Sequence, residues 1–186
     1  KYNQLESDMS LKIVQESRGV IIDLNDYTVA CRAFDKFFNV QEPHAAKLTK
    51  NIRALEKVDG SIIKVWSDRN GNVRVSTNGM IDAADADILL PVNKIKTYQD
   101  LFNEALNKTD MKLEDFKKYR DYTLIFELVS PLNRIVVPYQ NTELFFLGVR
   151  NNQSGQEWTP YDFNDENLNN NFSRPKLYDI QTVEQA

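Results

Sequence analysis

Cysteine and histidine are almost absent from this sequence. Among its 186 residues there is one cysteine, Cys31, and one histidine, His44. A single cysteine cannot close a disulfide within the chain, so we expect the protein to work in the reducing cytoplasm. Two such side chains are also too few for a zinc site of the usual histidine and cysteine type. Oxygen-liganded Mg²⁺ is not excluded, because the chain has 27 Asp and Glu residues.

Glycine and long apolar runs are scarce as well. The six glycines form neither the Gly-x-x-x-x-Gly-Lys-Ser/Thr pattern nor the Gly-x-Gly-x-x-Gly pattern, so P-loop and Rossmann nucleotide sites are excluded. No apolar run approaches the roughly 20 residues that cross a bilayer. The N-terminus has no stretch of signal-peptide type, and because residue 1 is not Met we expect the sequence to begin within a longer protein.

The chain also lacks an excess of positive charge. Its net charge of −4 argues against a protein that grips nucleic acid with its whole surface. If the partner is RNA, the positive charge must be concentrated in a local groove or come from a segment outside this sequence. A hydrophobic content of 41% and a charged content of 27% are ordinary for a globular protein, and the length suits one medium-sized domain.

Short β-rich segments separated by turn residues dominate what is present. We expect strands at 20–24, 28–32, 61–66, 72–76, 122–129, 134–139 and 143–149. Asn25-Asp26 and Arg69-Asn70-Gly71 predict that the first four of these strands form two hairpins. The predicted fold class is α+β, built on antiparallel β-sheets with flanking helices.

Helical periodicity is found mainly within residues 97–119. One apolar stripe consists of residues three or four positions apart: Tyr98, Leu101, Phe102, Ala105 and Leu106. Leu113 and Phe116 predict a second, shorter helix. The polar, Asn-rich stretch 151–173 is expected to consist of loops.

The sequence Lys57-Val58-Asp59-Gly60-Ser61 places a lysine just before a tight turn into a strand. Taken alone, this pattern favours a surface lysine beside an Asp-Gly turn. The alternative is a nucleophile whose amine attacks the α-phosphorus of ATP. Such an amine must lose its proton near neutral pH, although a free lysine has a pKa of about 10.4. Nearby cations, a metal ion and partial burial can lower that pKa, and Gly60 allows the backbone to approach a nucleotide closely.

Four further segments give this lysine a context. They are Ser-Arg-Gly-Val-Ile-Ile at 17–22, Arg-Ala-Phe-Asp-Lys-Phe-Phe-Asn at 32–39, Phe-Glu-Leu-Val-Ser-Pro-Leu-Asn-Arg-Ile-Val at 126–136 and Leu-Phe-Phe-Leu-Gly-Val-Arg at 144–150. In this order and at this spacing, the segments resemble the phage-type ATP-dependent RNA ligase 1 family of lysyl-adenylate nucleotidyltransferases. The resemblance runs from about residue 2 to about residue 178. The second and third segments are specific to that family, whereas Lys-x-Asp-Gly is shared with DNA ligases and capping enzymes.

The resemblance implies a single adenylyltransferase domain over residues 1–186, with Lys57 as the catalytic residue that forms a phosphoramidate with AMP. Asp59 and Gly60 would shape the catalytic loop. Arg18 and Lys36 would contact the triphosphate of ATP, since fixed cations stabilise developing negative charge. The alternative for both cations is a solvated position at a strand edge.

The other nucleotide-binding residues implied by the resemblance are Glu56, Glu127, Leu147 and Val149. Glu127 would meet the ribose or a metal-bound water, and Leu147 or Val149 would pack on the adenine. An unpaired carboxylate within an apolar strand is costly, so the sequence itself favours a site role or a buried ion pair for Glu127.

Other residues near these motifs have structural or open interpretations. Phe37 and Phe38 are expected in the core, because aromatic pairs in strands usually pack inward. Asn133 and Arg134 either bind RNA or tie the turn. Asn78 stands where family members usually carry a basic residue, so a phosphate or nucleotide contact is expected to be missing there.

Two later family elements, a Glu-Gly-x-Val strand and a Lys-x-Lys strand, have no match before the sequence ends at Ala186, so we expect a domain that is incomplete at its C-terminus. The family function is joining of RNA 5′-phosphate and 3′-hydroxyl ends with ATP and Mg²⁺, as in repair of cleaved tRNA. It implies the cytoplasm of a bacterium or a phage-infected cell and no membrane partner. The alternatives are a DNA ligase or capping-type nucleotidyltransferase, and a non-catalytic fragment that binds nucleotide or RNA.

Overall fold

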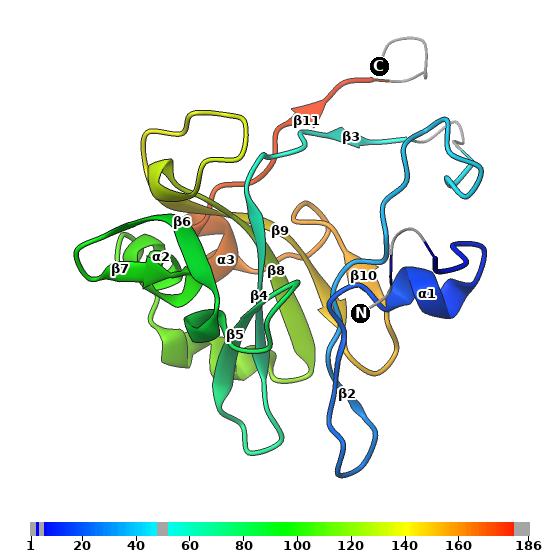
Figure 1. Ribbon diagram of the computed structural model, residues 1–186, viewed down its shortest axis with the longest axis horizontal. Helices are drawn as coiled ribbons and strands as arrows, with labels where there is room; N and C mark the ends of the chain where they lie inside the picture. The colour runs from blue at the N-terminus through cyan, green and yellow to red at the C-terminus, as the bar shows by residue number, and fades with distance from the viewer. Residues whose placement is uncertain (1–2, 4–5, 48–51, 181–186) are drawn as a thin grey trace.

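The computed structural model of the protein describes residues 3, 6–47 and 52–180. At its centre lies a five-stranded sheet of order β10-β9-β8-β4-β5, in which neighbouring strands are antiparallel (Figure 1). Its strands are β4 (Ser61–Ser67), β5 (Val73–Thr77), β8 (Tyr122–Val129), β9 (Glu143–Asn151) and β10 (Glu157–Trp158). The predicted α+β class with antiparallel sheet is confirmed.

Smaller elements surround this sheet. Two-stranded sheets pair β1 (Ile21–Ile22) with β2 (Val29–Cys31), β3 (Ala54–Leu55) with β11 (Leu177–Tyr178), and β6 (Asp87–Val92) with β7 (Ile95–Thr97). The α-helices are α1 (Lys12–Glu16), α2 (Tyr98–Leu106) and α3 (Glu166–Asn171), and the 3₁₀-helices are η1 (Ala83–Asp85), η2 (Leu113–Tyr119) and η3 (Pro131–Asn133).

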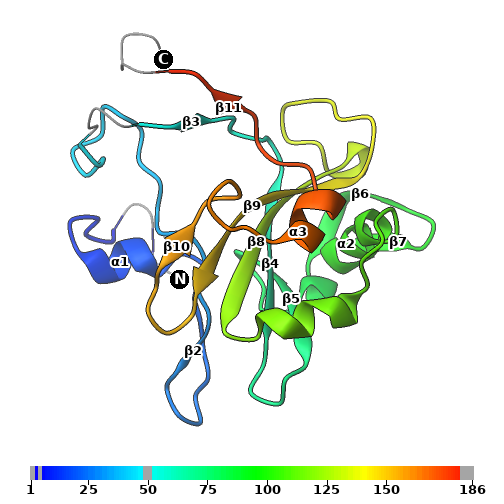
Figure 2. The same cartoon turned by 180° about the vertical axis from the view of Figure 1, so that it is seen from behind.

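Alternation along the central strands separates the two faces of the sheet. The residues of one face are buried in the hydrophobic core: Ile63, Val65, Leu124, Phe126, Leu128, Leu144 and Phe146. The helices α2, η2 and α3 lie on this side (Figures 1 and 2), and each adds a buried apolar side chain, namely Phe102, Phe116 and Leu168. Burying one such side chain contributes about 1.5–3 kcal/mol, so this face supplies much of the stability.

The opposite face of the same strands buries polar and apolar side chains side by side. Lys64 of β4 is 1% exposed, and Thr123 and Glu127 of β8 are 0% and 9% exposed, while the apolar Ile125, which pairs with Lys64, is 0% exposed. The hairpin β1-β2 lies on this side of the sheet (Figures 1 and 2), and just after it the backbone N–H of Arg32 donates to Thr123 Oγ1 at 2.9 Å. The buried charged groups of β4 and β8 therefore lie on this face of the sheet.

Both predicted hairpins and the first predicted helix are confirmed. In the β4-β5 turn, Gly71 has a φ of +80°, a conformation that favours glycine. The helix α2 begins at Thr97, whose hydroxyl accepts from the Asp100 backbone while the Asp100 carboxylate accepts from Thr97, forming a capping box. Its apolar stripe packs into the core, as the spacing predicts.

The predicted strand at 134–139 is wrong, because the chain after η3 forms an irregular loop. Pro138 has no N–H to donate to a neighbouring strand. The backbone N–H groups of Val136 and Val137 donate to Asp59 Oδ2, each at 2.7 Å. A local hydrogen-bond partner thus replaces a sheet ladder.

Three smaller predictions also need correction. The second helix is the 3₁₀-helix η2, and the stretch 151–173 contains β10 and α3 in addition to loops. Phe37 is 66% exposed, so its predicted core position is wrong. Phe38 is half-buried and its ring centroid lies 5.7 Å from that of His44. Within the described residues, no helix is both long enough and apolar enough to span a bilayer.

Candidate active site

The candidate nucleophile lies in the loop that joins β3 to β4. Lys57 is exposed, and the next residue, Val58, is 5% exposed and anchors the loop. A Cβ atom on Gly60 would lie 2.4 Å from the carbonyl oxygen of Leu128, so a larger residue would force the backbone to move. Glycine is therefore required at position 60 because β8 passes close to its backbone. The sequence analysis gave a different reason, namely close approach of a nucleotide.

Glu127 is the buried carboxyl group beside this loop. Its Oε1 accepts a hydrogen bond of 3.1 Å from the Gly60 backbone N–H, which ties β8 to the loop. Burial raises the pKa of Glu127 to about 7, against the lowering effects of that hydrogen bond and of the nearby charges of Lys57 and Arg18. The structure thus shows a buried Glu127 carboxyl, and its role at the ribose or at a metal-bound water stays a prediction.

The same electrostatic interactions show which predicted residues the fold brings together. Lys57 and Arg18 are near enough to Glu127 to lower its pKa, and Asp59 is near enough to raise it. Lys57 also helps to lower the pKa of Asp59. Residues from the start of the chain, from the loop and from the C-terminal half of β8 therefore lie near one another at one end of the central strands, with Lys57 exposed.

Asp59 holds the 134–141 loop against the nucleophile loop. Besides the two bonds from Val136 and Val137, its own backbone N–H donates to Tyr139 Oη at 3.3 Å. The two backbone hydrogen bonds lower the pKa of the Asp59 carboxyl. Its carboxylate is thus committed to the 134–141 loop, and the role in shaping the catalytic loop that the resemblance implies stays a prediction.

Asn133 lies at a buried junction between η3 and β4. Its side chain is 2% exposed, and its amide donates to Ser61 Oγ at 3.1 Å. Ser61 Oγ in turn lies 3.1 Å from Tyr98 Oη. Of the two interpretations, Asn133 therefore ties the turn, while Arg134 is exposed and its Nε donates to the Val136 carbonyl at 3.0 Å.

Two predicted nucleotide ligands have other contacts in the structure. Glu56 Oε2 accepts from the backbone N–H of Lys176 at 3.1 Å, where β3 pairs with β11. The amine of Lys36 lies 4.8 Å from the centre of the Phe38 ring, and its backbone N–H donates to Gln15. Among the described residues, no contact joins Lys36 to Lys57 or Glu127, so its role at the triphosphate stays a prediction.

The two candidate adenine contacts on β9 differ in burial. Val149 is 0% exposed and belongs to the hydrophobic core. Leu147 is half-buried, is not part of that core and lies at a bulge, because Gly148 pairs with Ile125 and Phe146 pairs with Phe126. We therefore retain Leu147 in place of Val149 as the candidate adenine contact.

Lys64 is a buried charged residue that the motif comparison did not single out. It lies in the middle of β4, and its amine donates to the carbonyl oxygen of Gly19, next to Arg18. Burial lowers the pKa of this amine. The available signal was a charged residue inside the apolar run Ile62-Ile63-Lys64-Val65, the same kind of signal that marked Glu127.

The side chains around Lys57 do not form a metal cage. Among the described residues, no three His, Cys, Asp or Glu side chains come together in a way that could hold a metal ion. Mg²⁺ commonly keeps several waters and binds through one or two carboxylates together with substrate phosphates. The residues fit an ion that arrives with a nucleotide, for which Glu127 is the candidate protein contact.

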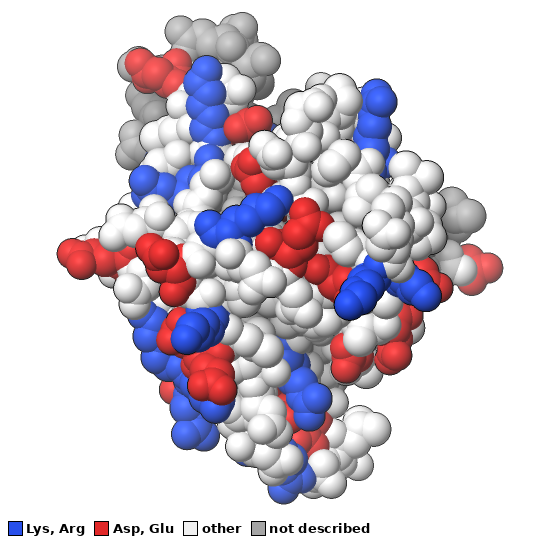
Figure 3. All heavy atoms as spheres, turned by 90° about the vertical axis from the view of Figure 1, so that its left-hand side faces the viewer, with Lys and Arg blue, Asp and Glu red and all other residues white. Residues whose placement is uncertain are grey.

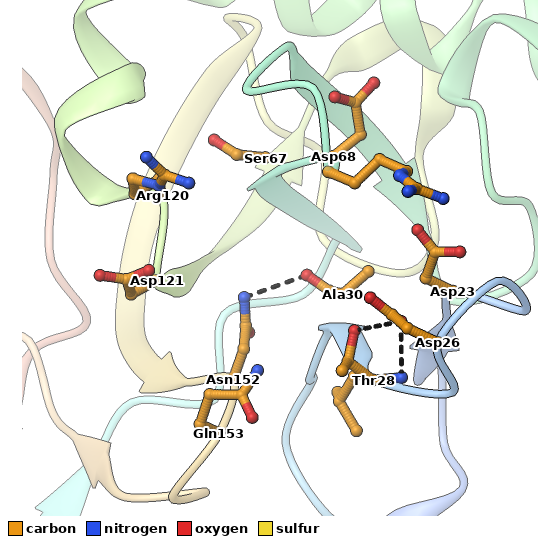
Figure 4. A pocket seen from close by; sticks show the side chains of 12 residues that line it. Asp23, Asp26, Thr28, Ala30, Ser67, Asp68, Arg120, Asp121, Asn152 and Gln153 are labelled. Atoms are coloured by element: carbon orange, nitrogen blue, oxygen red, sulfur yellow. Dashed lines mark hydrogen bonds between the residues drawn. The ribbon is translucent and has the colours of Figure 1, made fainter.

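A polar cavity of about 230 Å³ lies at the other end of the sheet, near the tips of the two hairpins (Figure 4). Its acidic lining consists of Asp23, Asp26, Asp68 and Asp121. Asp68 is already paired with Arg74 at 2.8 Å. The cavity is lined by Ser67, the last residue of β4, about 20 Å along the strand from the nucleophile loop. None of the predicted site residues lines it.

The surface on the side of β6, β7 and α2 carries charges of both signs, interspersed without a continuous basic area (Figure 3). This agrees with the net charge of −4. Binding of a polyanion over this whole face is therefore unfavourable, and any such contact must be local.

An antiparallel α+β sheet that holds a Lys-x-Asp-Gly loop against a buried glutamate defines a nucleotidyltransferase domain of the covalent ligase class. A solved structure of an archaeal ATP-dependent RNA ligase has the same fold, with a TM-score of 0.63 over 90% of this chain and 42% of that chain, at 16% identity. A family model described as RNA ligase matches residues 16–185. The chain belongs to this phage-type RNA ligase family.

Curated relatives include proteins of a virus, of phages and of Thermovibrio ammonificans. A protein of Autographa californica nuclear polyhedrosis virus, whose description names polynucleotide kinase and RNA ligase, is 34% identical over 167 residues, or 83% of this chain and 24% of its own length. The RNA ligase of Rhodothermus phage RM378 is 29% identical over 161 residues, 72% of this chain and 36% of its own. The chain thus spans between a quarter and about two-fifths of the length of such relatives.

Proposed function

We propose that this protein carries out ATP-dependent RNA ligation and that Lys57 is its covalent AMP carrier. The single observation behind this proposal is the cluster at one end of the central strands. There an exposed Lys57 lies within electrostatic reach of the buried Glu127 carboxyl, which Arg18 also reaches. Family membership supplies the reaction class, and the cluster supplies the candidate atoms.

In the first step, the Lys57 Nζ would attack the α-phosphorus of ATP. A P–N bond forms, the P–O bond to the β-phosphate breaks, and pyrophosphate leaves. The attacking amine must first release a proton. Glu127, whose pKa of about 7 lies near neutrality, is within electrostatic reach of Lys57 and would hold that proton. Arg18, and on the family resemblance Lys36, would stabilise the charge of the leaving pyrophosphate.

In the two later steps the AMP moves to RNA. An oxygen of an RNA 5′-phosphate attacks the AMP phosphorus, breaking the P–N bond and restoring Lys57. The 3′-hydroxyl of the second end then attacks the RNA 5′-phosphorus, and AMP leaves. Cleaved tRNA is the proposed substrate, and the cytoplasm of a bacterium or phage-infected cell is the proposed location. Mg²⁺, held by phosphate oxygens with Glu127 nearby, would neutralise charge on the phosphates.

The test is covalent labelling with ATP that is radioactive at its α-phosphate. Because the relatives are longer, the assay uses the full-length product of the gene alongside the 186-residue chain. Wild-type protein should retain label after denaturation, and Lys57→Ala should retain none. Lys94→Ala, which removes an exposed lysine in the β6-β7 turn, is the matched control and should label normally. Label that persists in Lys57→Ala would reject the assignment.

Substrate swaps separate the remaining alternatives. Label from GTP would indicate a capping-type enzyme, and sealing of nicked DNA in preference to single-stranded RNA would indicate a DNA ligase. Binding of ATP by calorimetry without any covalent adduct would indicate a non-catalytic nucleotide-binding module. The proposed function predicts label from ATP and joining of RNA ends.

A further inference from the structure

Lys64 is among the largest side chains that are completely buried in this protein, with 1% of its surface exposed. Lysine is rarely buried to this extent unless an acidic group pairs with it. Within the described residues, Lys64 has no carboxylate within ion-pair distance, and its hydrogen bond goes to a backbone carbonyl, that of Gly19. Burying a charge in this way costs stability, so we expect Lys64 to serve a purpose other than stabilising the fold.

The position of Lys64 in β4 places it on the face of the sheet opposite the core. Its neighbours Ile63 and Val65 point into the core, while Ile62, two residues away on the same face as Lys64, pairs with Glu127. The amine of Lys64 therefore lies on the face that carries the nucleophile loop. From there it reaches across to the segment that follows α1.

Two side chains meet at Gly19, which has a φ of +72°. A Cβ atom at Gly19 would lie 2.7 Å from Asn78 Oδ1 and 3.1 Å from Lys64 Nζ. Asn78 Oδ1 is buried and has no hydrogen-bond partner in the part of the chain that the structure describes. The turn at Gly19 is thus held between the amine of Lys64 on β4 and the side chain of Asn78, which follows β5.

Gly19 directly follows Arg18, whose charge acts on Glu127. The hydrogen bond from Lys64 fixes the peptide that begins at the Gly19 carbonyl, and with it the position of Arg18 beside the site. We propose that Lys64 is a positioning residue for nucleotide binding, holding from β4 the Gly19 turn that carries Arg18. This inference rests on the proposed adenylylation of Lys57.

Positions 64 and 78 lie next to the same turn. Lys64 pairs with Ser76 across the β4-β5 ladder, and Asn78, just after β5, has its Oδ1 beside Gly19 as Lys64 has its Nζ. A lysine at position 78 would therefore approach the same Gly19 carbonyl from the neighbouring strand. A charge moved from one strand to the other should keep the turn in place.

The experiment compares four proteins: wild type, Lys64→Met, Lys64→Met with Asn78→Lys, and Lys64→Met with Asn78→Gln. Lys64→Met should fold at least as stably as wild type, because it removes a buried charge, yet it should label Lys57 with AMP roughly 10- to 100-fold more slowly. Asn78→Lys should restore most of that rate, whereas the uncharged Asn78→Gln should not. Equal rates in wild type and Lys64→Met, or failure of Asn78→Lys to restore the rate, would overturn the proposal. So would failure of Lys64→Met to fold, since Lys64 would then be required for the fold.

Hydrogen exchange gives a second readout that does not depend on activity. The amides of Gly19 and Val20 should exchange faster in Lys64→Met and return toward the wild-type rate when Asn78→Lys is added. Unchanged exchange in Lys64→Met would contradict the positioning role. If wild-type protein takes up no AMP at all, the proposed function fails, while the exchange rates still decide whether Lys64 holds the Gly19 turn.

Discussion

The two faces of the central sheet are built by the same strands but have different compositions. On β8, Phe126 lies in the core while its neighbour Glu127 lies on the other face with its pKa raised to about 7. On β4, Val65 lies in the core while its neighbour Lys64 is a buried amine. Burial of apolar side chains stabilises the first face, whereas burial of these two ionisable groups on the second face is costly. Changes to the two faces should therefore affect different measurements.

The largest effect on stability is expected at the core face. Phe126 is 0% exposed, and its ring packs against those of Phe116, Phe146 and Phe172, with centroids 4.9–6.3 Å away. Phe126→Ala should lower the free energy of unfolding by about 3–5 kcal/mol. Urea denaturation measures this. A loss below about 1 kcal/mol would show that this face is not the stabilising one.

The next largest effect is the pH dependence of the free energy of unfolding that Glu127 causes on the opposite face. Glu127 has a pKa of about 7 in the folded protein and 4.5 as the reference value, so the folded state binds its proton more tightly. The corresponding stability is full below about pH 4.5 and is lost as the pH rises through about 7, by on the order of 3 kcal/mol. Glu127→Gln lacks this loss.

Urea denaturation at about pH 5 and about pH 8 makes that comparison. Because other acidic groups also titrate, the informative quantity is the difference in unfolding free energy between Glu127→Gln and wild type. This difference should move in favour of the variant as the pH rises. Parallel curves for the two proteins would contradict the raised pKa. Labelling of Lys57 should be slower in the variant, which cannot hold a proton at that position.

A matched pair on β9 tests the assignment of the adenine contact within one strand. Val149→Ala should lower the free energy of unfolding by about 2 kcal/mol and leave the KM for ATP unchanged, because Val149 lies in the core. Leu147→Ala should raise the KM for ATP severalfold, since Leu147 is the candidate adenine contact. A raised KM for ATP in Val149→Ala, with an unchanged KM in Leu147→Ala, would contradict the assignment of Leu147 as the adenine contact.

The smallest and most local effect is expected at Asp59. Asp59→Ala removes the acceptor of the Val136 and Val137 backbone N–H groups, so these amides should exchange with solvent faster while the core strands keep their protection. Asp59→Asn keeps one oxygen acceptor, so its Val136 and Val137 amides should exchange at rates between those of wild type and Asp59→Ala. No change in loop exchange in Asp59→Ala would show that the carboxylate does not hold the loop.

Patterns within a few residues were enough to predict much of the fold. Alternation and turn residues gave the β4-β5 hairpin, and the apolar stripe with Thr97 ahead of it gave α2. A carboxylate inside an apolar strand was enough to mark Glu127 as special, because an isolated buried charge is costly. The same reasoning, applied to the lysine inside the apolar run of β4, would have marked Lys64 as a residue that needs a special environment.

What could not be predicted depends on contacts between distant residues. The run Ile135-Val136-Val137 has the composition of a strand, but its backbone N–H groups bind Asp59, more than 70 residues earlier in the chain. The choice between Leu147 and Val149 depends on a bulge that shifts the register of β9 by one residue. Pro138 was a local warning against the strand, but the Asp59 contact and the position of the bulge have no local signal in the sequence.

The most direct test of the central claim is to locate AMP on the protein. Full-length protein would be incubated with ATP and Mg²⁺, digested, and analysed by tandem mass spectrometry. We predict AMP joined through a P–N bond to the Lys57 side chain and to no other lysine. AMP found on a different residue, or bound ATP with no covalent AMP on Lys57, would contradict the account.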